Sequence, residues 1–509
     1  MATFVLVALI FLAQWLVLFS PHVPEWDAAY YYAFARSFVF DQDLNLENDL
    51  MTAYPYVGPH FQASRLDRME QQRTITGRVD APFAIGSSLL WAGWLAGVRF
   101  LMPWLLDPAT AITGYEGPFI VTIAIVSTVY GWLAFWLGYR LAQPVVGRTL
   151  AAAAAITLMF TTPLLFYQFR DPIYSHTASA LTTGLVVYVW WHWRERPYTW
   201  SRGALLGALV GLATLVRWQH LMYLALPTVA AAWHWLTLLP EQRRQTVKPL
   251  LLYGVAMGAA ALIVFTPQMY VWRLFYGSWV AIPQGNDFVV WTAPFWWPTL
   301  FSTYRGLFLW MPVALFSFIG LVELTRQKPR TFGPLLLVLL LEFYVNSSTR
   351  DWFGGGGFGP RRFTSELVIL LLGYAGFLHL ISRGLGRWRY SQWGTALTTL
   401  GLGLILAVQE WILLRYGLAE KIGGTNLSMQ PDFRWQETSF TTFVHQISQH
   451  LGDIRQHLSD FIILPRSPMY VWLQTGAFPW SQVIILLAVG LTAAAVWFIL
   501  QWAIRYFAR

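Results

Sequence analysis

Two carboxylates beside an aromatic run near the N-terminus are the first residues whose types could do chemistry. Glu25 and Asp27 are followed by three tyrosines at 30–32. A partly buried carboxylate can act as a general base on a hydroxyl. The alternative interpretation is an aromatic belt at a membrane interface, with both acids in water.

A second acidic segment carries oxygen-bearing side chains at alternate positions, which are Asp41, Asp43, Asn45, Glu47 and Asp49. The first three positions resemble those of a calcium-binding EF-hand loop. That loop requires glycine where this chain has Leu46, and glutamate where it has Thr52. The sequence therefore speaks against an EF-hand. It leaves two alternatives, a looser divalent-cation site and a solvated acidic loop.

Charged residues recur at the ends of apolar runs further along the chain. The segment 168–176 contains Arg170, Asp171 and His176, Arg217 ends a later run, and Arg305 lies near the start of another. Charges at a membrane boundary are costly unless they are paired or lie in a wet cavity. These residues are candidates for a polar site, and the alternative for Arg170 and Asp171 is a local structural ion pair.

The most distinctive motif is the glycine-rich segment at 350–362, R-D-W-F-G-G-G-G-F-G-P-R-R. Glycine lets the backbone approach a ligand closely. Arg361 and Arg362 then open an apolar run, where the N–H groups of a helix start also favour an anion. Arginine pairs bidentately with phosphate. The motif lacks the Gly-Lys-Ser/Thr ending of a P-loop. The alternative is a flexible loop without a ligand, with Glu342 as a structural counter-charge.

Composition places these motifs in a membrane protein. Hydrophobic residues make up 56% of the chain and charged residues 12%, whereas soluble domains are about 25% charged. The apolar excess forms runs of about twenty residues, the length that spans a bilayer. Soluble enzymes, fibrous proteins and disulfide scaffolds are excluded. The chain has no cysteine, which excludes thiolate chemistry. The net charge of +9 is interpreted as arginine in cytoplasmic loops, and no nucleic-acid partner is predicted.

The predicted fold is all-α, a polytopic transmembrane bundle with about twelve spans and both termini in the cytoplasm. Basic loops are expected in the cytoplasm and must alternate with external loops along the chain. This alternation holds if the apolar run 82–106 does not cross the membrane but is embedded in it from the outside. We divide the chain into a first transmembrane helix (1–20), an extracytoplasmic loop with the embedded helix and membrane-surface helices (21–117), a transmembrane core that would be catalytic (118–412), an extracytoplasmic loop with an amphipathic helix (413–479), and a last transmembrane helix with a cytoplasmic tail (480–509).

Two motifs together resemble those of GT-C membrane glycosyltransferases, the lipid-carrier-dependent enzymes related to protein O-mannosyltransferases and aminoarabinose transferases. The first is E-W-D-A-A-Y-Y-Y-A-F-A-R-S at 25–37, with the acidic segment that follows it. The second is W-F-G-G-G-G-F-G-P-R-R-F-T at 352–364. The resemblance extends over the chain as far as about residue 380.

The resemblance implies that Asp27 is an essential acid of the first external loop. Glu25 precedes it and Ala28 follows it, so the division of roles between the two acids stays open. Asp171 matches a second acidic turn, which helps to hold a metal in oligosaccharide-transferring relatives. Only one acid is present in this turn. A divalent metal held by Asp27 and Asp171 is therefore left open, and no other cofactor is predicted.

The implied activity is transfer of a sugar from a polyprenyl-phosphate donor to a hydroxyl of an acceptor glycan, lipid or protein. The reaction would be a single inverting displacement at the outer face of a bacterial inner or plasma membrane. Asp27 would be the base. The donor phosphate would bind Arg361, Arg362, Arg217 and Arg170, and further site candidates are Asp171, His176, Arg305 and Trp352. The competing functions are a flippase for lipid-linked saccharides and a non-catalytic membrane subunit. The motifs gather on the outer face, which favours the enzyme.

Overall fold

A computed structural model describes residues 2–57, 72–104, 112–302, 304–385, 401–403, 407 and 467–506. In these ranges the regular structure is helical, and pairing of extended backbone is limited to two isolated bridges. The prediction of an all-α chain is confirmed. The amphipathic helix expected in 413–479 and most of an apolar run expected at 393–412 lie outside the described residues.

The chain forms two compact units, each built from three separate stretches. Unit 1 consists of Met1–Phe19, Trp132–Phe166 and Val289–Phe478. Unit 2 consists of Ser20–Gly131, Tyr167–Phe288 and Pro479–Arg509. Helix α6 (Gly117–Val146) begins in unit 2 and ends in unit 1. The five-segment division from the sequence stays a prediction.

Unit 1 is built around α14, which packs against both α15 and α16, and α16 also packs against α7. Its helices are α1 (Ala2–Leu18), α7 (Arg148–Thr161), α12 (Trp296–Phe301), α13 (Leu307–Trp310), α14 (Val313–Gln327), α15 (Pro329–Ser347), the 3₁₀ helix η7 (Arg361–Glu366), α16 (Leu367–Leu385) and α20 (Pro468–Thr475).

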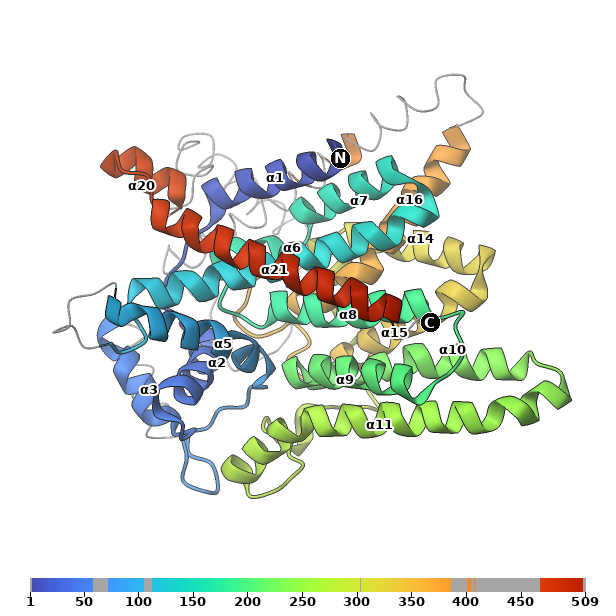
Figure 1. Ribbon diagram of the computed structural model, residues 1–509, viewed down its shortest axis with the longest axis horizontal. Coiled ribbons are helices and arrows are strands. Elements are labelled where there is room, and N and C mark those ends of the chain that lie inside the picture. Colours follow the sequence, from blue (N-terminus) through green and yellow to red (C-terminus); the bar gives the residue numbers. More distant parts are fainter. Residues whose placement is uncertain are drawn as a thin grey trace. The chain divides into compact units, whose positions relative to one another are not determined.

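Unit 2 is built around α9, which lies along α11 and also packs against α8 and α5 (Figure 1). Its α-helices are α2 (Asp27–Arg36), α3 (Leu46–Ala53), α5 (Gly86–Leu101), α8 (His176–Trp193), α9 (Trp200–Val216), α10 (Ala225–Leu236), α11 (Pro240–Tyr276) and α21 (Trp480–Tyr506). Shorter helical turns are η1 (Ser37–Asp41), η2 (Tyr54–Tyr56), η3 (Met102–Trp104), η5 (Trp218–Leu224) and η6 (Asn286–Phe288), with η4 (Phe166–Arg170) starting at the unit boundary.

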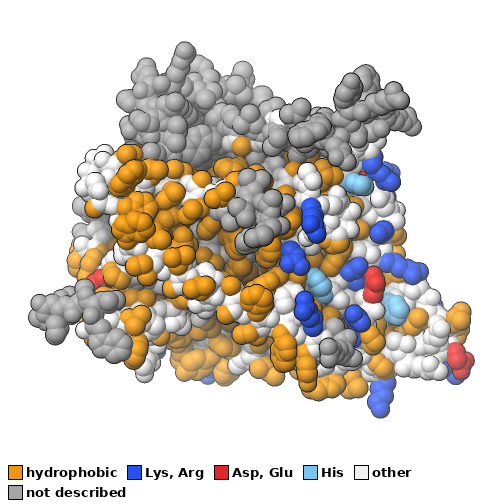
Figure 2. Space-filling model, turned by 45° about the horizontal axis from the view of Figure 1, so that its top comes forward, with side chains coloured by type: hydrophobic (Ala, Val, Ile, Leu, Met, Phe, Trp, Pro, Cys, Tyr) orange, Lys and Arg blue, Asp and Glu red, His pale blue; other side chains and the backbone are white. Residues whose placement is uncertain are grey.

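Four described helices are long and apolar enough to cross a membrane: Gly117–Val146, Pro240–Tyr276, Arg361–Gly384 and Trp480–Tyr506. Exposed apolar side chains cover a wide area of the face shown in Figure 2. The chain is therefore an integral membrane protein, whereas the count of about twelve spans stays a prediction. Helix α5 has 16 residues, a rise of about 24 Å, against a hydrocarbon core of about 30 Å. The non-spanning placement of 82–106 stays a prediction.

Polar contacts within unit 2 attach the first loop to the C-terminal end of α11. The Ile85 amide donates to Gln268 Oε1 at 2.9 Å, and the Thr76 hydroxyl donates to the Phe275 carbonyl at 2.8 Å. The Tyr276 hydroxyl donates to Asp80 Oδ1 at 2.7 Å. Each contact joins two residues that are more than 180 positions apart in the sequence. They fix the segment that begins α5 against a long helix.

Close packing of α9 on α11 depends on glycines spaced four residues apart along one face of α9. A Cβ added at Gly207 would overlap the backbone carbonyl of Met257, and one at Gly211 would lie 2.6 Å from the carbonyl oxygen of Ala261. Small residues let membrane helices approach closely. This contact sets where α9 ends, and hence the position of Arg217.

We expect Gly207→Ala to destabilise the protein by about 1–3 kcal/mol, because the new methyl group must push α9 away from α11. The measurement is the thermal unfolding midpoint of the purified protein in detergent. The matched control is Gly254→Ala on α11, where nothing lies within 4 Å of the added Cβ. That control should be neutral or more stable by up to about 1 kcal/mol. Equal midpoints for the two variants would contradict the packing argument.

Candidate active site

Asp27 is the first residue of α2, directly after a strained residue. Trp26 has φ 52° and ψ −131°, a conformation that L-residues rarely adopt. Such strain costs about 1–3 kcal/mol and gathers at functional sites. The side chains of Glu25 and Asp27 are both partly exposed. This loop therefore presents two accessible carboxylates at the start of a rigid helix.

The aromatic run after Asp27 faces inward. Tyr30, Tyr31 and Tyr32 are at most 7% exposed, and Tyr30 belongs to the core formed by α2, α3 and α11. This core, and not an interfacial belt, holds the helix. Tyr31 lies one helical turn after Asp27, so the two residues share a face of α2.

A chain of hydrogen bonds joins Tyr31 to Arg217 within unit 2. Arg217 Nε donates to the Ser175 hydroxyl at 3.0 Å, and Ser175 donates to the Tyr31 hydroxyl at 3.2 Å. Because Tyr31 accepts from Ser175, its own hydrogen is left to donate elsewhere. The structure thus ties the helix of Asp27 to a guanidinium through two hydroxyls.

His176 supports the same arginine from the first turn of α8. Arg217 Nη2 lies 3.1 Å from His176 Nδ1, and the histidine is fully buried. Its ring packs on Tyr167 with a centroid distance of 3.9 Å. Arg217 itself has left α9, with φ −153° and ψ 126°. Its side chain therefore lies at the start of α8, where helix N–H groups favour an anion.

Asp171 is held by a histidine of the first loop. His22 Nε2 lies 3.4 Å from Asp171 Oδ1, and His22 Nδ1 lies 3.0 Å from the Ser20 carbonyl. Arg170 ends the π-helical turn η4 beside it. Over the described part of the chain, no three His, Asp or Glu residues come together as metal ligands. Asp171 contacts His22, and a metal held by Asp27 and Asp171 stays untested.

The carboxylate oxygens of the second acidic segment form ion pairs and hydrogen bonds with neighbouring protein groups. Arg36 pairs with Asp41 at 2.6 Å and with Asp49 at 2.5 Å. Glu47 pairs with Arg73 at 2.7 Å, and Asp43 Oδ1 accepts from the Ser37 hydroxyl and the Asn45 amide. These contacts favour a structural role for the segment over both alternatives, the divalent-cation site and the solvated loop.

In unit 1 the glycine-rich loop wraps around Arg361. Arg361 Nε donates to the Gly354 carbonyl at 2.6 Å, and Arg305 donates to the Gly355 carbonyl. Both glycines have positive φ, 79° and 62°. A Cβ at Gly354 would lie 3.1 Å from Arg361 Cγ. Glycine is needed here because the backbone turns tightly against an arginine.

The other candidates of this loop have distinct surroundings. Arg362 forms an ion pair with Asp351, which partly neutralises it. Trp352 is 8% exposed and packs edge-on against Phe353. Arg305, which lies outside the loop sequence and donates to it, has a strained φ of 70°. The suggested counter-charge, Glu342, is fully buried on α15.

The structure therefore groups the predicted residues in two sets. Unit 2 brings together the helix of Asp27, the 170–176 turn and Arg217, and unit 1 brings together Arg305 and Arg361. The sequence analysis missed Tyr31, Ser175 and His22. A signal existed for Tyr31, which follows Asp27 by four residues. None existed for Ser175 or His22, whose partners are 144 and 149 residues away.

Comparison with known proteins gives neighbours in fold only. No family model and no curated protein matches the chain. The archaeal oligosaccharyltransferase AglB from Archaeoglobus fulgidus, in complex with an inhibitory peptide and a dolichol-phosphate, is similar at 14% identity with a TM-score of 0.44, over 82% of this chain and 57% of AglB. The apo form of the Archaeoglobus fulgidus oligosaccharyltransferase is similar at 13% identity with a TM-score of 0.44, over 82% of this chain and 58% of that chain. This chain thus spans little more than half the length of AglB.

ArnT from Cupriavidus metallidurans in the apo state is similar at 13% identity with a TM-score of 0.47, over 90% of this chain and 76% of ArnT. At such identities and scores these neighbours assign no residue role and no substrate to this chain.

The buried Asp49 predicts a pH dependence of stability. Burial raises the pKa of Asp49 to about 7, although Arg36 lowers it in part; the pKa of an unfolded aspartate is about 3.9. Between these values the folded protein holds a proton that the unfolded chain releases. The contribution of Asp49 to stability is therefore full below pH about 4 and is lost as the pH rises through about 7.

We expect Asp49→Asn to flatten the decline of the unfolding midpoint between pH 5 and pH 8, because the amide does not titrate. The measurement is thermal unfolding of both proteins at several pH values. Asp43→Asn, at an exposed position of the same segment, is the control and should keep the wild-type slope. An unchanged slope in Asp49→Asn would show that other groups carry the dependence.

Proposed function

We propose that this protein is a membrane glycosyltransferase that moves a sugar from a polyprenyl-phosphate donor to an acceptor hydroxyl at the extracytoplasmic face. The observation that carries the proposal is the connection in unit 2 between an accessible carboxylate and a cation. Asp27 and Arg217 are joined by one turn of α2 and two hydrogen bonds, through Tyr31 and Ser175. A carboxylate base and a phosphate-binding arginine are the two groups that this transfer requires.

The proposed reaction is a single displacement. The acceptor hydroxyl gives its proton to Asp27 while its oxygen attacks the anomeric carbon of the sugar. A new carbon–oxygen bond forms on one face, and the bond from the anomeric carbon to the phosphate oxygen breaks on the other. Polyprenyl phosphate leaves with the bonding electrons, and the sugar configuration inverts. Glu25 lies two residues before Asp27 and is the other acid of this loop that could act as the base, so the two residues are tested side by side.

Charge develops on the phosphate as it leaves, and Arg217 is placed to stabilise it. Its hydrogen bonds to the Ser175 hydroxyl and to the His176 ring orient the guanidinium. The Tyr31 hydroxyl has a hydrogen left to donate to a substrate oxygen. Arg170 is the second phosphate-binding candidate of this unit. A pre-oriented donor of this kind reduces the cost of reorganisation during the reaction.

The glycine-rich loop of unit 1 supports a separate phosphate-binding prediction. Arg361 of the loop and Arg305, which precedes α13, both donate to backbone carbonyls of the loop, so they present charge on a rigid frame. Arg362 also pairs with Asp351, and we expect it to contribute less than Arg361. Trp352 is buried under the loop and is expected to support it.

The first test is release of polyprenyl phosphate from a panel of polyprenyl-phosphate monosaccharides, with purified protein in lipid. Asp27→Asn is expected to reduce turnover by about 100-fold or more, since general-base catalysis contributes about 10²- to 10⁴-fold. Glu25→Gln is the comparison, and the variant with the larger loss identifies the base. Wild-type turnover in both would refute the base assignment. Movement of labelled lipid without release of phosphate would instead indicate a flippase.

The second test concerns the cations. Arg217→Gln and Arg361→Gln should each lower kcat/KM for the donor by about ten- to a hundredfold, the equivalent of a charged hydrogen bond of about 1.5–3 kcal/mol. Arg217→Lys keeps the charge but loses the fork geometry and is expected to recover only part of the activity. An exposed arginine of the first loop, Arg73, serves as the control. A cation whose removal leaves kcat/KM unchanged does not bind the donor.

A further inference from the structure

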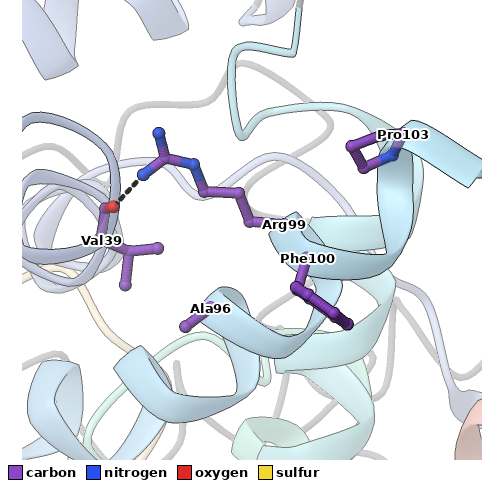
Figure 3. A pocket seen from close by; sticks show the side chains of 5 residues that line it. All are labelled: Val39, Ala96, Arg99, Phe100 and Pro103. Atoms are coloured by element: carbon purple, nitrogen blue, oxygen red, sulfur yellow. Dashed lines mark hydrogen bonds between the residues drawn. The ribbon is translucent and has the colours of Figure 1, made fainter.

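A pocket beside the C-terminal end of α5 has no place in the proposed reaction. It is lined by Val39, Ala96, Arg99, Phe100 and Pro103 and has a volume of about 500 Å³. Four of these residues lie at spacings of three, four and seven along one face of α5 and the turn that follows it. Figure 3 shows Arg99 reaching across from this face to Val39.

The face of α5 that forms the pocket is apolar and open. Phe100 is 66% exposed and Leu101 is 47% exposed. A Cβ added at Gly93 or Gly97, on the same face, would meet nothing within 4 Å. The opposite face is packed inside unit 2 through Trp91 and Leu95, both fully buried. An exposed apolar face of this kind on a membrane protein fits hydrocarbon chains.

Among the described residues that line the pocket, Arg99 is the charged one. It donates to the Val39 carbonyl and lies over the Phe40 ring, 4.7 Å from its centroid. Within the described ranges no carboxylate lies within ion-pair distance of it. Arg36, which lies over the same ring at 5.2 Å, is paired with Asp41 and Asp49. Of the two arginines at this ring, Arg99 is the one whose charge remains for an external anion.

We propose that this pocket binds one anionic diacyl phospholipid. The phosphate of the headgroup pairs with Arg99, for which the guanidinium fork is suited. An acyl chain lies along the open face past Ala96 and Gly97. A cation at the rim of an apolar groove matches a lipid that carries both features. A zwitterionic lipid also has a phosphate, but its own ammonium group offsets the negative charge that the arginine would meet.

The test is native mass spectrometry of the full chain in detergent, titrated with dioleoylphosphatidylglycerol and, separately, dioleoylphosphatidylcholine. The wild type is expected to bind the first phosphatidylglycerol about tenfold more tightly than phosphatidylcholine. Arg99→Gln should abolish that preference. Arg78→Gln is the matched control, because Arg78 also donates to a carbonyl, of Leu44, and also lies over a ring, of Phe275 at 5.5 Å. It should keep the preference.

A second variant, Ala96→Trp, fills the pocket and should remove the tight site for phosphatidylglycerol even if Arg99→Gln does not fold. The proposal is overturned if Arg99→Gln keeps the preference or if Arg78→Gln loses it equally. It is also overturned if millimolar inorganic phosphate displaces the lipid, since the ligand is then a free anion. Binding of a polyprenyl phosphate but not of phosphatidylglycerol would assign the pocket to the donor carrier. Loss of a dimer in Ala96→Trp without any change in lipid binding would assign it to a second copy of the chain.

Discussion

Arg217 joins segments of unit 2 that are distant in the sequence, because a guanidinium at the end of an apolar helix needs acceptors. It leaves α9 in an extended conformation and finds the Ser175 hydroxyl and the His176 ring at the start of α8. Ser175 in turn reaches α2 through Tyr31. The position of the Asp27 carboxylate is thus linked to one cation. The glycine face of α9, which packs on α11, sets the position of the helix end from which Arg217 extends.

Five arginines of the described residues fall into two kinds, according to what holds them. Arg36 and Arg362 are bound by carboxylates, and such ion pairs stabilise local structure but offer little charge to a ligand. Arg217, Arg361 and Arg99 donate to hydroxyl, imidazole or carbonyl groups, and these bonds orient a guanidinium without neutralising it. The first kind shapes the loops, and the second kind is suited to anions that arrive from outside.

The helices could be predicted from the sequence because a membrane requires long apolar runs. The last predicted transmembrane segment, 480–509, contains α21 (Trp480–Tyr506). Ends set by tertiary contacts could not be predicted: α7 ends at Thr161, just before the chain turns at Pro163. Candidate site residues could be named from the sequence, but the partners that hold them could not. Spacing does not reveal that Asp351 pairs with Arg362 or that Ser175 meets Tyr31, since such contacts depend on how the helices pack.

Helix α11 has 37 residues, which gives a length of about 56 Å, nearly twice the thickness of the hydrocarbon core. A helix of that length must extend into water. Its last turns make the contacts to Thr76, Asp80 and Ile85. The first loop is therefore attached to the end of a long helix. In the proposed reaction, this attachment would hold the Asp27 carboxylate at a fixed distance from a donor anchored in the membrane. A shorter or longer α11 would change that distance.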